Sequence, residues 1–82
     1  SKKPAKLSYK DQRDYDILPD KIKSLDEMIA RAESEMSDPA LYSRNPDRFA
    51  TLTAEIEKIR SEKEAAEERW LTLAMMVEEM AG

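Results

Sequence analysis

The chain has 82 residues, enough for one small domain at most, and a compact core of this size is only marginally stable. Charged residues make up 39% of the chain and aromatic residues 6%, and its single glycine is the last residue, so the composition indicates helix and argues against tight β-hairpins. Without cysteine, histidine or a long apolar run, the sequence offers no disulfide, no thiolate or imidazole metal site and no membrane span.

The chain begins with a basic segment, residues 1–13. It contains five basic residues and one acidic residue, a net charge of +4, whereas the remaining residues carry a net charge of −8. Because four lysines and Arg13 surround Tyr9, we expect this segment to contact phosphates, with Tyr9 available for base stacking. The alternative is a solvated linker in which Tyr9 packs under Trp70. Residues 1–7, which start without Met, are interpreted as a linker within a longer protein.

A first seven-residue repeat follows the basic segment. Its apolar positions alternate steps of three and four, which is typical of a left-handed coiled coil. Pro19 interrupts the repeat, so we predict helices over about 8–18 and 19–37 with a kink between them. Ser8 is the expected N-cap of the first helix. The repeat comprises Tyr15, Leu18, Ile22, Leu25, Ile29, Ala32 and Met36.

Residues 38–45 are predicted to form the tip at which the chain reverses. Asp38-Pro39 and Asn45-Pro46 each place a capping side chain before a proline, where the missing N–H costs nothing. We expect Leu41 and Tyr42 to close the apolar end of the seam. The tip also supplies Arg44 and Arg48 as candidates for contact with a nucleic acid or a protein.

A second seven-residue repeat predicts a helix over 46–80 that pairs antiparallel with the first. In this register Met36 meets Phe49 and Tyr15 lies near Trp70. Lys63 is the one polar seam residue, and we expect its ammonium group beside Asp20 or Glu67. The repeat comprises Phe49, Leu52, Ile56, Ile59, Lys63, Ala66, Trp70, Leu73, Val77 and Met80.

The predicted fold is therefore all-α: an antiparallel two-helix coiled-coil hairpin with a short N-terminal helix packed at its base. No phosphate-binding glycine loop or nucleophile elbow occurs. The carboxylates of Glu64, Glu67 and Glu68, and of the pair Glu78-Glu79, are interpreted as a solvated face. We expect no catalysis, no metal and no cofactor in this chain.

Three runs of sequence carry a family resemblance: KLSYKDQRDYDILPDKI, SDPALYSRNPDRF and EERW. Together they resemble the C-terminal domain of ABC-F ATP-binding cassette proteins of the Uup type, over about residues 6–75. The chain departs from the family pattern with Asp14-Tyr15, where Glu-Leu is usual. The resemblance implies a cytoplasmic parent protein whose two upstream ATPase domains bind ATP and magnesium, with residues 1–7 as the linker to them and residues 8–80 as the hairpin domain.

The resemblance also implies a parent that acts on ribosomes and translation and in DNA transactions, through a C-terminal domain that binds DNA. We therefore predict a monomeric, non-catalytic domain that binds DNA or RNA electrostatically and without sequence specificity. The alternative is a structural or protein-interaction arm that contacts the ribosome or the ATPase domains. No membrane contact is expected. The candidate binding residues are Lys2, Lys3, Lys6, Tyr9, Lys10, Arg13, Arg44 and Arg48.

Overall fold

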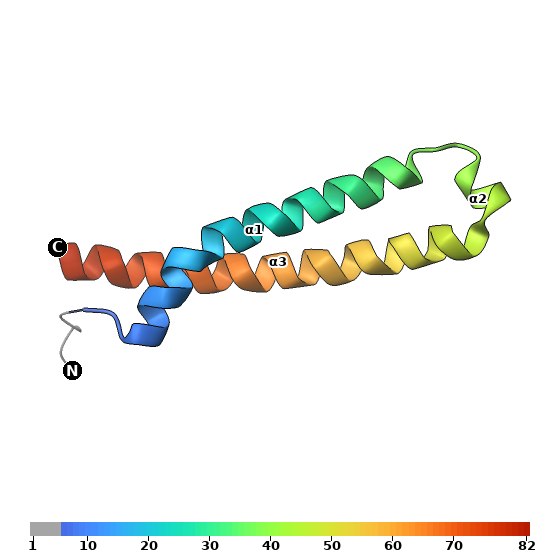
Figure 1. Cartoon of the computed structure of the whole chain (residues 1–82). Coiled ribbons are helices and arrows are strands. Elements are labelled where there is room, and N and C mark those ends of the chain that lie inside the picture. The colour runs from blue at the N-terminus through green and yellow to red at the C-terminus, as the bar shows by residue number, and fades with distance from the viewer. Residues whose placement is uncertain (1–5) are drawn as a thin grey trace.

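The computed structural model describes residues 6–82 as a helical hairpin. Helix α1 (Tyr9–Met36) runs out to a tip that contains the short helix α2 (Leu41–Arg44), and α3 (Pro46–Ala81) returns antiparallel to α1 (Figure 1). The molecule measures 60 × 18 × 18 Å. The predicted all-α hairpin is confirmed, and no strand occurs within residues 6–82. No helix in this range combines the length and apolar character needed to cross a membrane.

The two repeats form the seam between α1 and α3, as predicted. Every position of both repeats is buried or half-buried. Most of the buried side chains form two groups along the hairpin, each held by the hydrophobic effect, while Leu7 and Leu25 are buried outside both groups. The tip cluster contains Ile29, Ala32, Leu41, Leu52 and Ile56, and the base cluster contains Leu18, Ala66 and Leu73. Leu41 therefore closes the apolar end of the seam, as expected.

Polar side chains cap the helices where the sequence places them. The backbone N–H of Asp11 donates to Ser8 Oγ at 3.1 Å, and that of Arg48 donates to Asn45 Oδ1 at 3.1 Å. Asp38 Oδ1 accepts from the backbone N–H of Ala40 at 2.9 Å, which stabilises the turn before α2. These bonds satisfy donors that have no partner within the helix.

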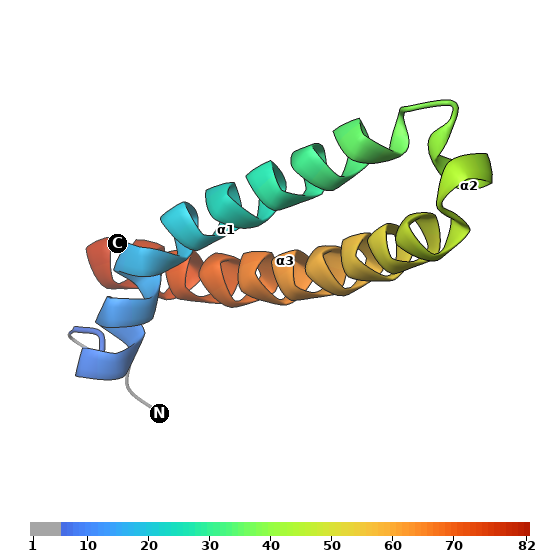
Figure 2. The same ribbon diagram turned by 45° about the vertical axis from the view of Figure 1, so that its right-hand side comes forward.

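The predicted division of the first helix at Pro19 is corrected by the structure. α1 is one continuous helix with Pro19 inside it. Its axis bends in this region, so that the N-terminal part of α1 lies across the base of α3 (Figures 1 and 2). A proline removes one helical hydrogen bond and pushes against the preceding turn, and a bend relieves that clash without ending the helix. The short N-terminal helix of the prediction is thus the first part of α1.

Lys63 has a different partner from the two expected. Its Nζ lies 2.6 Å from Asp26 Oδ1, and the hydrogen bond with Asp26 raises the pKa of Lys63. Glu67 adds a weaker attraction, and Asp20 forms no ion pair with it. The half-buried lysine stem therefore crosses the seam to α1 instead of running along its own helix.

Candidate functional site

The candidate binding residues in the described part of the basic segment lie on the outer face of the hairpin's base. Lys6, Tyr9, Lys10 and Arg13 are all exposed, and 85% of the Tyr9 surface is accessible. The alternative prediction that Tyr9 packs under Trp70 is therefore wrong. Lys2 and Lys3 lie outside the described residues, so their placement stays a prediction.

Tyr15, and not Tyr9, is the partner of Trp70. Their ring centroids are 5.9 Å apart with an interplanar angle of 7°, which confirms the predicted pair. Leu7 is also buried, and Leu73 in the base cluster is fully covered. A stacked aromatic pair adds to the stability gained from burial alone, so it fixes the inner face of the bent part of α1.

Arg69 ties the start of α1 to α3 through two carboxylates. Its Nη2 lies 2.6 Å from Asp11 Oδ1 and 3.3 Å from Asp14 Oδ2, and we call this group the Arg69 clamp. The hydrogen bond from Arg69 lowers the pKa of Asp11, and the same bond raises the pKa of Arg69. Sequence reasoning missed this group. The available signal was the position of Arg69 beside the seam residue Trp70.

The clamp leaves an excess of positive charge on the outer face, where Asp16 is the one exposed carboxylate among residues 6–17. Asp11 and Asp14 are engaged by Arg69 on the inner side of α1. Among residues 6–82, Lys6, Lys10 and Arg13 form no ion pair. Three exposed cations therefore lie together at the base of a molecule whose remainder is acidic.

The two tip arginines are bound within the domain. Arg48 donates from Nε and Nη2 to both carboxylate oxygens of Glu35, at 2.6 and 2.9 Å. Arg44 Nη2 lies 2.9 Å from Asp38 Oδ2. The Arg48 guanidinium lowers the pKa of Glu35, whereas that of Asp38 is lowered first by the backbone N–H of Ala40 and then by Arg44.

The tip arginines and the basic segment do not form one surface. α1 carries the basic segment at one end of the hairpin, and α2 lies at the other (Figure 1). Tyr42, at the tip, is 65% exposed but packs edge-to-face on Phe49, with centroids 5.3 Å apart. The candidate residues that the structure describes thus belong to two separate ends of a 60 Å molecule.

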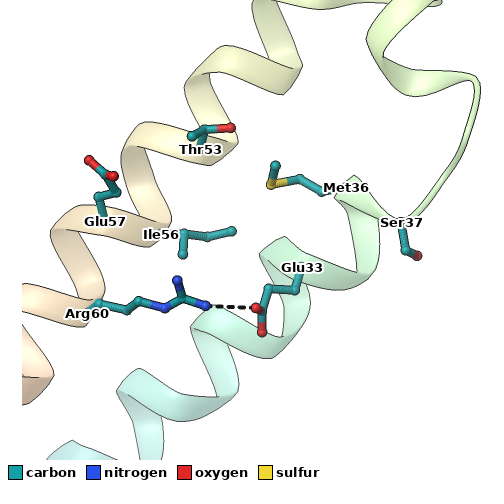
Figure 3. A pocket seen from close by; sticks show the side chains of 7 residues that line it. All are labelled: Glu33, Met36, Ser37, Thr53, Ile56, Glu57 and Arg60. Atoms are coloured by element: carbon teal, nitrogen blue, oxygen red, sulfur yellow. Dashed lines mark hydrogen bonds and ion pairs between the residues drawn. The ribbon is translucent and has the colours of Figure 1, made fainter.

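An open groove near the tip contains no catalytic arrangement. Met36 and Ile56 supply apolar surface, and the ion pair between Arg60 Nη2 and Glu33 Oε2, 2.9 Å long, links the two long helices at its edge (Figure 3). The side chains that line it are Glu33, Met36, Ser37, Thr53, Ile56, Glu57 and Arg60. In the part of the chain that the structure describes, no three carboxylate side chains gather in a metal-binding arrangement.

Comparison with known proteins gives a consistent family match. Residues 6–75 match the family model described as the ABC transporter C-terminal domain. No solved structure matches the chain significantly.

Three curated relatives match across most of the chain. The "ATP-binding protein Uup" of Caulobacter vibrioides is 41% identical over 81 residues, which cover 99% of this chain and 13% of that protein. The "Uncharacterized ABC transporter ATP-binding protein YfmR" of Bacillus subtilis is 39% identical over 79 residues, covering 96% of this chain and 12% of that protein. The "ATP-binding protein Uup-like" of Haemophilus influenzae is 32% identical over 68 residues, or 83% and 15% of the two chains. The chain thus spans roughly an eighth of its relatives' length.

Proposed function

This chain belongs to the ABC transporter C-terminal domain family, as the C-terminal domain of a Uup-type ABC-F protein, and from that premise we propose that it is a non-catalytic module that binds nucleic acid electrostatically. The proposal concerns DNA or RNA without sequence preference. Its contact surface is the outer face of the base, formed by Lys6, Lys10 and Arg13. Lys2 and Lys3 extend this surface in the proposal.

One observation carries the proposal: at one end of an acidic domain, exposed cations that form no ion pair within residues 6–82 outnumber the exposed carboxylates. Lys6, Lys10 and Arg13 are exposed, and the nearby Asp11 is held by Arg69. Phosphate groups attract such cations and release their own counterions on binding. The tip arginines support a contact less well, because each would first have to leave a carboxylate inside the domain.

The acidic body limits the contact to the base. The chain has a formal net charge of −4, so a polyanion that lay along α3 would be repelled. Three phosphate contacts predict an affinity that falls about twenty- to fortyfold between roughly 50 and 200 mM salt. Binding should therefore be weak and strongly salt-dependent.

A matched pair of variants tests the location of the nucleic-acid contact surface. We expect the triple variant Lys6→Gln, Lys10→Gln, Arg13→Gln to lose most of the wild-type affinity for a labelled DNA duplex in fluorescence anisotropy at low salt. The control variant Lys23→Gln, Arg31→Gln, Lys58→Gln has the same change in net charge. It also removes exposed residues that form no ion pair within residues 6–82. Equal loss in the two variants would show a general charge effect and contradict a base contact.

A second candidate function rests on the far side of the base. Leu71 and Met75 are 56% and 55% exposed and lie four residues apart on α3, so they form an apolar strip. Such a strip suits a protein-interaction arm that contacts the ribosome or the ATPase domains. If the wild-type chain bound neither DNA nor RNA at low salt, this second function would replace the first.

The relatives' names give a further proposal for the parent protein. They describe ATP-binding proteins, and we propose that a longer protein containing this domain binds ATP with magnesium outside it. We also propose that the parent acts in the cytoplasm, in translation or on DNA.

A further inference from the structure

The Tyr9 ring is unusually available for a tyrosine on a packed helix. The other two tyrosines each lie against an aromatic partner, Tyr15 on Trp70 and Tyr42 on Phe49. Tyr9 has no such partner among residues 6–82 and is the most exposed large apolar side chain there. A single exposed ring needs no explanation by itself. The side chains around Tyr9 indicate a role for its exposed ring.

Tyr9 borders a shallow depression on the outer face of α1. Tyr9, Arg13 and Ile17 are each four residues apart, so they form one row along the helix, and Gln12 and Asp16 line the depression on one flank. Gln12 Nε2 donates to Asp16 Oδ1 at 3.0 Å. The spacing of Lys10 places it on the opposite flank. The depression therefore has an aromatic end, a cation at its centre, and one polar and one basic side.

The length of the row limits what can bind. From Tyr9 to Ile17 the helix rises about 12 Å, at 1.5 Å per residue. Nucleotides of one strand are about 3.4 Å apart in a stacked helix, so the row accommodates a few nucleotides. The Asp16 carboxylate repels phosphate, which directs the sugar-phosphate backbone to the flank with Lys10 and Arg13.

We propose that an unpaired nucleobase stacks on Tyr9 while its neighbouring phosphates contact Lys10 and Arg13. The domain therefore prefers single-stranded to double-stranded nucleic acid. This rests on the proposed function, which supplies the electrostatic contact common to both forms. In a duplex the base faces are covered by their neighbours, so Tyr9 adds nothing; in a single strand each base has a free face, and stacking tolerates any sequence.

The test compares single and double strands on tyrosine variants. Fluorescence anisotropy at low salt would measure binding of labelled oligo-dT, oligo-U and a short DNA duplex to the 82-residue chain. We expect Tyr9→Leu, which keeps an apolar side chain, to weaken single-strand binding about tenfold and leave duplex binding unchanged. Tyr9→Phe should retain wild-type affinity because the ring remains. Tyr42→Leu, at the tip, is the matched control and should change neither affinity.

The outcomes separate this inference from the proposed function. If Tyr9→Leu binds single strands as tightly as the wild type while the Lys6, Lys10, Arg13 triple variant does not, stacking is wrong and electrostatic binding stands. If the wild-type chain binds no oligonucleotide, both proposals fail. Circular dichroism of each variant confirms that the helices are retained.

Discussion

At the residue scale, Arg69 on α3 is linked to the first turns of α1 at the base. One guanidinium engages two carboxylates on the first turns of α1, and both of those carboxylates are less than a quarter exposed. Hydrogen bonds between charged groups are stronger than those between neutral groups. The clamp also decides which charges face outward, because it takes Asp11 and Asp14 away from the surface that carries Arg13.

The carboxylates in these pairs predict an acid-sensitive fold. Hydrogen bonds from Arg69 and Arg48 lower the folded-state pKa of Asp11 and Glu35, and the backbone N–H of Ala40, followed by Arg44, lowers that of Asp38. Their contribution to stability is therefore present above the ordinary carboxyl pKa and is lost as the pH falls through the lowered folded-state values. Thermal unfolding followed by circular dichroism should show a falling midpoint below about pH 4.

A variant pair assigns part of that loss to the clamp. Asp11→Asn should lower the unfolding midpoint at neutral pH, and the difference from the wild type should shrink as the medium becomes acidic. Asp20→Asn removes an exposed carboxylate that forms no ion pair within residues 6–82, so it should follow the wild type at every pH. Parallel curves for Asp11→Asn and the wild type would contradict the assignment.

At the element scale, α3 shows how steeply burial changes over two residues. Leu73 is 0% exposed in the base cluster, whereas Leu71 is 56% exposed on the other side of the same helix. Burial of an aliphatic side chain removes apolar surface from water and fills space that relaxes little when the side chain is lost. Truncation of Leu73 therefore measures mainly the loss of packing, whereas truncation of Leu71 measures mainly the change in helix propensity.

Truncation of these two leucines should lower the free energy of unfolding by very different amounts. We expect Leu73→Ala to lower the free energy of unfolding by about 2–5 kcal/mol in urea titrations. Leu71→Ala should lie within about 0.5 kcal/mol of the wild type, as is usual for exposed sites. A small effect of Leu73→Ala would mean that the base cluster does not hold the hairpin together.

The same elements show what the sequence could predict. The two repeats, the capping roles of Ser8 and Asn45, and the Tyr15–Trp70 pair follow from local spacing, and the structure has all of them. The continuity of α1 through Pro19 could not be predicted, because a bend and a break remove the same hydrogen bond and differ only in tertiary packing. The partners of Lys63 and Arg69 depend on long flexible side chains that reach acids on either helix, so spacing alone left them open.

At the scale of the whole molecule, most of the core lies in two clusters, one toward each end, with Leu25 buried outside both. The tip cluster and the base cluster share no side chain, and the ion pair of Lys63 with Asp26 links the helices in addition to them. The extents of 60 × 18 × 18 Å leave no thick interior, so the seam carries most of the packing. An isolated hairpin of this kind exposes much of each helix to water.

Sedimentation tests whether the hairpin is a monomer in solution. Because the seam positions are already covered within one chain, we expect a monomer of 9.5 kDa at every concentration, with the slow sedimentation of an elongated particle. A mass that doubled with concentration would show that the exposed faces pair between copies. If such a dimer formed, the Leu71→Ala variant would locate its interface. Loss of the dimer in this variant would place the interface on the apolar strip.

The bend at Pro19 divides α1 into a short arm and a long arm that point in different directions. The arm before the bend is short and is held by the Arg69 clamp, while the arm beyond it reaches to the tip (Figure 2). If the short arm is fixed to a partner, a small rotation about the bend sweeps the tip through a much larger arc. The Arg69 clamp and the stack of Tyr15 on Trp70 both join the short arm to α3, so the hairpin would follow such a rotation as one body.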